Sequence, residues 1–415
     1  MINVVAIAQL GERKTEDLEV TGSIPVCDRI YYFKIFINFK MVNTNSIIEE
    51  LINNNCIKIG SFKLKSGDIS KYYFDMKNIV SYPNIVKNIG DLMYEIINKQ
   101  ECDIICGVPI GGLPVCSYIS TKYDKPMIMV RNEVKSYGTT KQIEGTYKSS
   151  DKCIIIEDVI TSGQSVQKVI DILKDKVNIV GVVVIIDRQQ CYKCSVPVNS
   201  LITKTDIVKF KLFKIMEEKK SRLCFSADVD DSDKLIEIVN NIGKYIVICK
   251  IHYDFYEENE YFKQKLIESS IKHNFLIMED RKFVDISYTV QKQYKKFYNW
   301  VDLITVMGNV NSSVVESLSG VLLVANMSNN IFDFTQEALE LSKNYKKNIV
   351  GFITQKRIEE PHMLCMTPGI NIKKKNDNDQ NYRTVDDVDT DIIIVGRGIY
   401  QNHNYIEECK KYSIL

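Results

Sequence analysis

The chain has 415 residues, 45% of them hydrophobic, which is enough for two or three globular domains with cores of their own. Its 54 lysines and arginines nearly balance 53 acidic residues, and the net charge of +1 excludes a global field that would attract nucleic acid or an anionic membrane. The apolar runs are far shorter than a membrane span, so we expect neither nucleic acid nor membrane as a partner.

The 12 cysteines are scattered through apolar runs, a pattern that favours a reducing, cytoplasmic location. Cys191-Tyr-Lys-Cys194 is a lone C-x-x-C pair in a chain with only four histidines, so we do not expect a zinc site there. No side chain is assigned as a metal ligand.

Residues 1–40 have no sustained periodicity, and we expect them to be an extension outside the fold. Met41 precedes an amphipathic helical stretch, so we expect translation to begin there and a first domain to span residues 41–203. Within it, the stretch Phe62 to Asp75 predicts a hairpin around a glycine turn.

Two apolar runs, Cys102-Asp-Ile-Ile-Cys106 and Pro126-Met-Ile-Met-Val130, are separated by a helical stretch, a β-α-β rhythm typical of a parallel sheet. A third run, Cys153-Ile-Ile-Ile156, leads into the acids Glu157 and Asp158 and then into a loop rich in hydroxyl groups that opens a helix. Free N–H groups at a helix N-terminus bind phosphate, and two adjacent acids can bind ribose hydroxyls. A plain turn capped by Ser165 is the structural alternative.

This third junction resembles the phosphoribosyl pyrophosphate loop of type I phosphoribosyltransferases. Leu64-Lys-Ser-Gly67, Lys135-Ser-Tyr-Gly138 and Asp187-Arg-Gln189 narrow the resemblance to orotate phosphoribosyltransferases. It implies a Rossmann-like α/β domain with Mg²⁺ as cofactor. It also implies catalysis by Lys135, which would close over the pyrophosphate in the partner subunit's site, and binding of the orotate carboxylate by Arg188. The substrate-binding residues that it implies are Lys65, Phe74, Arg131, Tyr137, Glu157, Asp158, Thr161, Ser162, Gly163, Ser165 and Arg188.

One position departs from that family: Asn132 stands where a second lysine is usual. Loss of a cation there would weaken pyrophosphate binding. The alternative is therefore that only the second half of the chain is active, with the first half a weakened or phosphoribosyl-binding module.

Lysine and glutamate crowd residues 204–220, where Ile207, Phe210 and Phe213 follow an imperfect helical spacing. We interpret this stretch as a helical linker whose apolar stripe packs against a core.

Residues 221–415 alternate strand and helix patterns to the end of the chain. This alternation predicts a (β/α)8 TIM barrel, a fold in which sites lie at the C-terminal ends of the strands. The eight strands are expected to begin near Leu223, Tyr245, Phe275, Val301, Gly320, Asn348, His362 and Asp391.

The third of these strands is followed by a cluster of charged side chains. Asp280, Lys282 and Asp285 fall within a few residues, and packing them together without a ligand would cost several kcal/mol. The cluster therefore indicates chemistry, with a solvated charged turn as the alternative.

Met278-Glu-Asp-Arg-Lys-Phe283 resembles the signature of orotidine 5′-monophosphate decarboxylases, and that resemblance extends over residues 221–415. It implies a decarboxylation without a cofactor, catalysed by Lys250, Asp280, Lys282 and Asp285. Since Asp285 and Thr289 would enter from the partner subunit, it also implies a homodimer. The substrate-binding residues that it implies are Ser226, Asp228, Thr289, Ser328, Gln380, Tyr382 and Arg397.

The two resemblances in this order are those of bifunctional uridine 5′-monophosphate synthases. They imply that orotate and phosphoribosyl pyrophosphate give orotidine 5′-monophosphate, which loses carbon dioxide to give uridine 5′-monophosphate. A sugar-phosphate lyase on the same type of barrel is a rival for the second half.

Overall fold

The computed structural model describes residues 44–64, 67–131, 141–190, 192–256, 259–328, 332–373, 375–377 and 380–414. The predicted extension, residues 1–40, therefore lies outside the described residues. Residues 43–415 group into one compact unit, and all that follows concerns this unit.

A helix over residues 44–53 is followed by the predicted hairpin. Its strands, β1 (Ile57–Lys63) and β2 (Ile69–Phe74), pair antiparallel, and a 3-10 helix, η1 (Met76–Ser81), follows. Phe74 thus stands at the very end of β2.

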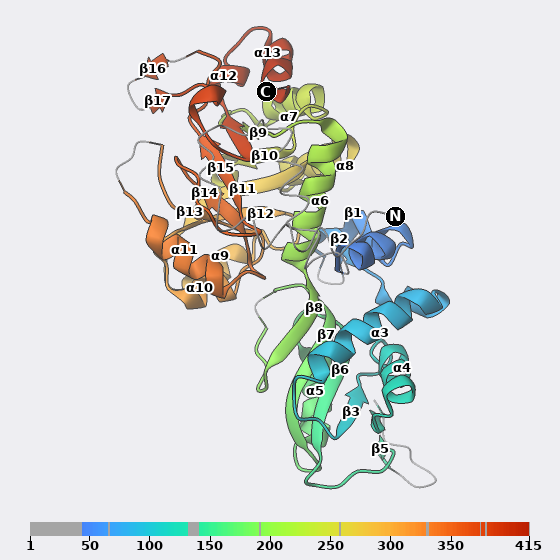
Figure 1. Ribbon diagram of the computed structural model, residues 1–415. Coiled ribbons are helices and arrows are strands. Elements are labelled where there is room, and N and C mark those ends of the chain that lie inside the picture. The colour runs from blue at the N-terminus through green and yellow to red at the C-terminus, as the bar shows by residue number, and fades with distance from the viewer. Residues whose placement is uncertain are drawn as a thin grey trace, which may run out of the picture. The chain divides into compact units, whose positions relative to one another are not determined.

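A six-stranded sheet has the strand order β5-β4-β3-β6-β7-β8 (Figure 1). All neighbouring strands are parallel except β4 and β5, which confirms the predicted β-α-β organisation. The strands are β3 (Ile104–Gly107), β4 (Met127–Val130), β5 (Ile143–Glu144), β6 (Lys152–Ile160), β7 (Asn178–Asp187) and β8 (Val198–Thr203).

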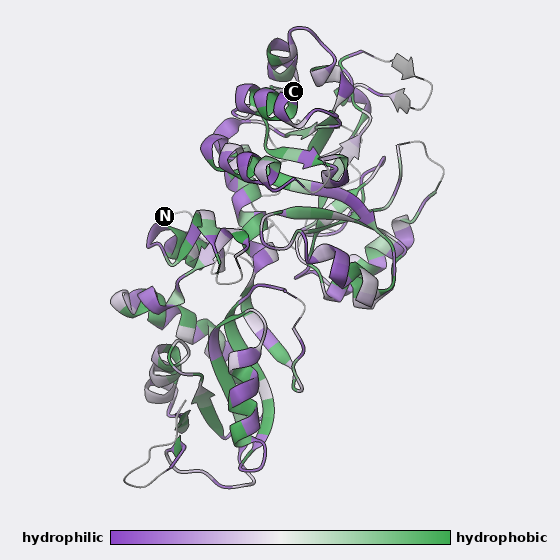
Figure 2. Ribbon diagram, turned by 180° about the vertical axis from the view of Figure 1, so that it is seen from behind, coloured by the Kyte–Doolittle hydropathy of each residue, from purple (hydrophilic) through white to green (hydrophobic). Residues whose placement is uncertain are grey.

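Both faces of this sheet are covered by helices, so the buried middle stretches of its central strands are apolar (Figure 2). Helices α3 (Pro83–Ile97) and α4 (Leu113–Tyr123) pack on the face that carries Ile105 and Ile154. Helix α5 (Gln164–Leu173) packs on the face that carries Ile155. The chain thereby places the C-terminal ends of β3 and β6 beside the start of α5.

Helix α6 (Lys204–Lys219) occupies the stretch in which the spacing predicts one, and it begins with a capping box between Thr203 and Asp206. The lysines of this helix are not all exposed to solvent: Lys204, Lys209 and Lys211 are buried. Burial lowers the pKa of Lys204 to about 7 and that of Lys209 to about 8. The ammonium groups of Lys204 and Lys209 donate hydrogen bonds to backbone carbonyls, and that of Lys204 lies 2.7 Å from Tyr298 O.

Eight parallel strands close into the predicted barrel, and each begins within three residues of its expected position. They are β9 (Leu223–Ser226), β10 (Ile248–Ile251), β11 (Leu276–Phe283), β12 (Leu303–Met307), β13 (Val321–Val324), β14 (Ile349–Ile353), β15 (Leu364–Pro368) and β18 (Ile392–Val395). A small hairpin, β16 (Lys375–Asp377) and β17 (Gln380–Tyr382), is inserted before the last strand.

Helices surround the barrel and share one continuous apolar core with the outward faces of its strands. They are α7 (Ser232–Ile242), α8 (Glu260–His273), α9 (Ser287–Tyr294), α10 (Ser312–Glu316), α11 (Thr335–Asn344), α12 (Arg397–Tyr400) and α13 (Tyr405–Ser413), with the 3-10 helices η2 (Tyr253–Tyr256) and η3 (Val385–Asp387). In the described part of the chain, every helix is too short or too polar to cross a membrane.

Candidate active sites

A cavity of about 260 Å³ opens at the C-terminal ends of the barrel strands. Its lining includes eight of the residues predicted for the decarboxylase site: Ser226, Asp228, Lys250, Asp280, Lys282, Ser328, Tyr382 and Arg397. These residues come from strands and loops spread over the whole sequence of the barrel, and the fold brings them together as its topology requires.

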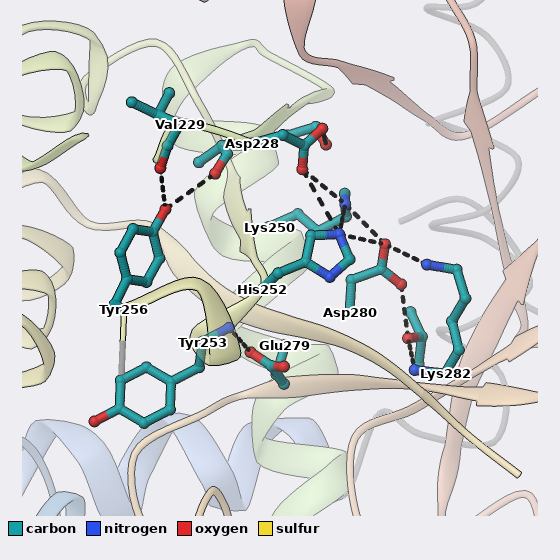
Figure 3. A network of polar contacts seen from close by, with 12 residues as sticks. Asp228, Val229, Lys250, His252, Tyr253, Tyr256, Glu279, Asp280 and Lys282 are labelled. Carbon is teal, nitrogen blue, oxygen red and sulfur yellow. Dashed lines mark hydrogen bonds and ion pairs between the residues drawn. The ribbon is translucent and has the colours of Figure 1, made fainter. Parts of the chain in front are cut away.

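Asp280 lies at the centre of this cavity, between two lysines (Figure 3). The Nζ of Lys250 is 2.7 Å from Asp280 Oδ2, and the Nζ of Lys282 is 2.9 Å from the same oxygen. Lys250 also lies 3.6 Å from Asp228 Oδ1, so acid and base alternate along one wall.

This arrangement fixes the charge of the central carboxylate. Burial acts to raise the pKa of Asp280, but the positive charges of Lys250 and Lys282 outweigh it and hold the pKa well below its usual value. Burial likewise acts to lower the pKa of Lys250, and the charges of Asp280 and Asp228 raise it instead. Asp280 and Lys250 therefore hold each other in the charged form.

Two further residues of this site were missed by the sequence analysis. The buried Thr305 hydroxyl donates to Asp280 Oδ1 at 2.8 Å and accepts from the Lys282 backbone N–H at 2.9 Å. His252 Nε2 lies 3.2 Å from Lys250 Nζ, and its position two residues after Lys250 was a usable signal, because alternate residues of a strand share a face.

The backbone of Lys282 is held in an unusual conformation, with a φ of 52°. A lysine rarely adopts this left-handed conformation, which costs on the order of 1–3 kcal/mol unless the surroundings fix it. The hydrogen bond from Lys282 N to Thr305 supplies such a constraint and directs the ammonium group back toward Asp280.

Other predicted residues lie elsewhere. Asp285 is exposed and Thr289 is only partly buried, and neither lines the cavity of its own chain. The backbone of Gln380 belongs to β17, but its side chain lies outside the described part.

The predicted phosphate loop also has the expected form. Helix α5 begins directly after Gly163, whose φ of 74° lets the chain turn into the helix. Gly163 is therefore the N-cap, and the alternative of a cap at Ser165 is wrong. Thr161, Ser162 and Ser165 surround this turn, at the place where the first N–H groups of α5 are free to bind an anion.

Glu157 and Asp158 lie within β6 and not beyond its end, since the strand continues to Ile160. Burial, together with a hydrogen bond to Asp158, raises the pKa of Glu157 to about 9. The pair thus combines one acid that retains a proton with one that is partly exposed, which suits contacts with hydroxyl groups.

Arg188 follows directly after β7, and its guanidinium lies 5.4 Å from the centre of the Phe74 ring. Burial lowers the pKa of Arg188. Arg131 donates to Glu144 at 2.7 Å, which joins β4 to β5. Lys65, Lys135 and Tyr137 lie outside the described residues, as does Asn132.

Among the described residues no group of three or more His, Cys, Asp or Glu side chains lies together as a metal site. Of the predicted C-x-x-C pair, Cys191 is outside the described part and Cys194 carries a free thiol.

Two family models match the chain in the order of its two sites. Residues 75–214 match the phosphoribosyl transferase domain. Residues 221–412 match the orotidine 5′-phosphate decarboxylase / HUMPS family.

Curated relatives match nearly the whole chain. A uridine 5′-monophosphate synthase of Bos taurus is 30% identical, over 88% of this chain and 95% of the relative. One of Caenorhabditis elegans is 28% identical over 88% and 94%. An orotidine 5′-phosphate decarboxylase of Pichia kudriavzevii is 39% identical, over 50% of this chain and 91% of that protein.

Two similar solved structures each align with less than half of this chain. A Leishmania donovani UMP synthase is 26% identical and covers 43% of this chain and 39% of that one, with a TM-score of 0.38. An orotidine 5′-monophosphate decarboxylase from Methanocaldococcus jannaschii is 24% identical and covers 46% and 97%, with a TM-score of 0.37.

Proposed function

This chain belongs to the uridine 5′-monophosphate synthase family, and from that premise we propose how its two sites work. It is a bifunctional enzyme of pyrimidine biosynthesis, in which a phosphoribosyltransferase converts orotate to orotidine 5′-monophosphate and a decarboxylase converts that product to uridine 5′-monophosphate. An enzyme with only the decarboxylase active is not favoured, because the relatives that span the chain are bifunctional synthases.

The observation that carries the decarboxylase mechanism is the carboxylate held ionised between two lysines in the barrel cavity. Asp280 meets the carboxylate of the substrate, and their repulsion is relieved as carbon dioxide leaves. The electron pair of the broken C–C bond stays on the pyrimidine carbon, where Lys282 stabilises it and then donates a proton. Lys250 keeps Asp280 ionised throughout.

The rest of the cavity orients the substrate. Ser226 and Ser328 contact the pyrimidine ring, and Asp228 contacts the ribose. Tyr382 and Arg397 bind the phosphate, a role supported by the Arg397 guanidinium lying 5.5 Å from the centre of the Tyr382 ring. Gln380 is assigned to the same phosphate on the family resemblance.

In the transferase site, the loop around Gly163 binds the 5′-phosphate of phosphoribosyl pyrophosphate, and Glu157 and Asp158 bind the ribose hydroxyls. Arg188 forms a forked pair with the orotate carboxylate. Lys135 stabilises the departing pyrophosphate, and Lys65, Arg131 and Tyr137 bind the substrates.

We propose Mg²⁺ as the cofactor of this first step. The residues present fit a cation held mainly by substrate oxygens, because the acidic pair Glu157 and Asp158, on the strand that leads into the phosphate loop, could complete its oxygen ligands. When bound, Mg²⁺ neutralises the polyphosphate, and the decarboxylase cavity, with its own lysines, needs no cofactor.

Chelation of Mg²⁺ separates the two activities. With orotate, phosphoribosyl pyrophosphate and Mg²⁺ the enzyme should form uridine 5′-monophosphate and carbon dioxide. With a chelator in excess, uridine 5′-monophosphate formation from orotate should fall at least about a hundredfold, while decarboxylation of added orotidine 5′-monophosphate should be unchanged. A decarboxylase that also needs the metal would contradict the assignment and revive a metal-dependent lyase.

We also propose that the enzyme is a homodimer in which Asp285 and Thr289 complete the cavity of the partner. Asp285 is exposed and is flanked by apolar side chains that are also exposed, Val284 at 63%, Ile286 at 69% and Tyr288 at 65%. Such a patch beside a charged residue is typical of a protein interface.

A mixing experiment tests this sharing. Lys250→Ala and Asp285→Ala should each be nearly inactive as decarboxylases. When the two variants are unfolded, mixed and refolded, half of the dimers are mixed, and each mixed dimer has one undamaged site. The activity should return to about a quarter of wild type.

A mixture of Lys250→Ala with Lys282→Ala is the matched control, because those two residues share one chain's cavity. It should regain no activity. If the first mixture also stays inactive although mixed dimers form, Asp285 acts within its own chain and the shared site is wrong.

The free thiols support a cytoplasmic location. Among the described residues the cysteines form no disulfide, and burial raises the pKa of Cys106, Cys153 and Cys365.

A further inference from the structure

Tyr298–Asp302, the segment that leads into β12, lies at the end of the barrel opposite the decarboxylase cavity. Asn299 in this segment is buried and contacts two separate parts of the first half of the chain. Its carbonyl accepts from the backbone N–H of Lys71 at 2.9 Å, and its Oδ1 accepts from Gln190 Nε2 at 3.0 Å.

Gln190 is one of two glutamines on the C-terminal side of Arg188 that reach barrel residues. Gln189 donates from Nε2 to the carbonyl of Lys347 at 3.0 Å, and its Oε1 accepts from the hydroxyl of Thr205 at 2.8 Å. Gln189 also has a φ of 53°, so the backbone beside Arg188 is held in a conformation that needs such fixing.

The other contact of Asn299 is on the strand that carries Phe74. Lys71 lies three residues before Phe74 on β2, and the Phe74 ring packs under the Arg188 guanidinium at 5.4 Å. Asn299 therefore ties together two elements that carry residues assigned to substrate binding: the end of β2, with Phe74, and the loop that begins with Arg188, the proposed ligand of the orotate carboxylate.

We infer that Asn299 of the barrel is a positioning residue for orotate in the transferase site. It acts through Gln190 and β2, and it holds Arg188 and Phe74 at the spacing that the planar substrate needs. This inference rests on the proposed role of Arg188. It makes the barrel part of the binding site for the first substrate, although the barrel performs the second reaction.

The test separates the two substrates of the transferase. Gln190→Leu and Asn299→Leu in the full chain should each raise the KM for orotate about tenfold, as expected for one lost buried hydrogen bond. The KM for phosphoribosyl pyrophosphate should be unchanged, because its loop lies on α5. The decarboxylase kcat, measured with added orotidine 5′-monophosphate, should also be unchanged.

A double variant shows whether the two residues act through one bond. Gln190→Leu combined with Asn299→Leu should be no worse than either single variant. Gln167→Leu is the matched control, since this half-buried glutamine on α5 donates within its own helix, to Asp171. It should leave both KM values at wild type.

An unchanged KM for orotate in Gln190→Leu and Asn299→Leu overturns the inference, as does an equal rise for both substrates, which indicates a merely structural role. If Asn299→Leu does not fold, Gln190→Leu in the loop decides alone. Arg188→Ala distinguishes a failure of the proposed orotate site from a failure of its positioning by the barrel. A normal orotate KM in that variant refutes the proposed orotate site, whereas a raised one with normal Gln190→Leu refutes only the positioning by the barrel.

Discussion

Lys282→Ala should lower kcat/KM of the decarboxylase at least about a thousandfold, which corresponds to about 4 kcal/mol of transition-state stabilisation. The ammonium group of Lys282 lies 2.9 Å from Asp280 and has two proposed roles, stabilising the carbanion and supplying its proton. Alanine removes both. It also leaves Asp280 with Lys250 as its remaining lysine, so the substrate carboxylate meets more uncompensated negative charge.

Transferase activity in the same preparation reports whether the variant is folded, and it should be normal, so that orotidine 5′-monophosphate accumulates from orotate. Lys282→Arg keeps a positive charge but holds its proton too tightly to donate it, and should remain severely impaired. Lys234→Ala, on the exposed side of α7, is the control for loss of a lysine. A loss of less than tenfold in Lys282→Ala would contradict the proton-donor role.

Asp302→Ala should cost about 3–5 kcal/mol of stability, because it leaves a buried lysine without its counter-charge. Asp302 is fully buried, forms an ion pair with Lys71, and accepts from the Tyr72 hydroxyl at 2.5 Å and from Ile277 N at 2.8 Å. Burial acts to raise the pKa of Asp302, but the charge of Lys71 lowers it overall. The contribution should therefore be complete above pH ~4 as long as Lys71 is charged, and be lost on further acidification. Burial lowers the pKa of Lys71, so the contribution also falls on the alkaline side.

Denaturant unfolding followed by tryptophan fluorescence measures this loss, since the single tryptophan, Trp300, is buried two residues from Asp302. Glu101→Ala removes the partner of Lys152 in a surface ion pair and should leave the stability close to that of wild type. Replacing both partners by apolar residues, Lys71→Met with Asp302→Leu, should recover most of the loss. Equal stability of Asp302→Ala and wild type would contradict a stabilising contribution from the Lys71–Asp302 ion pair.

The barrel and most of its cavity were predictable because they depend on local patterns. Each strand is a short apolar run, and its functional residue follows at the C-terminal end, as Lys250 and Asp280 do. Thr305 could not be predicted in the same way. Its role arises from the register between β11 and β12, which joins residues 23 and 25 positions apart.

The burial of the α6 lysines was not predicted either. Lysine and glutamate at helical spacing usually indicate a solvated surface, and Lys204 and Lys209 look no different in sequence from exposed lysines. They are buried because the loops before β12 and β14 supply carbonyl acceptors more than 90 residues away, Val301 O for Lys204 and Lys346 O for Lys209. Contacts between residues so far apart in the chain depend on the tertiary fold and cannot be predicted from the local sequence.

The anchoring of the barrel through Asn299, Asp302 and Lys347 also restricts how this chain can evolve. The N-terminal face of a barrel normally serves stability alone, so its loops can drift or change length. Here the loops before β12 and β14 supply hydrogen bonds to the first half of the chain. A barrel transplanted from a free-standing decarboxylase would lack them. The two halves are therefore expected to evolve together, because a substitution at this contact in one half must remain compatible with the contacting surface of the other half.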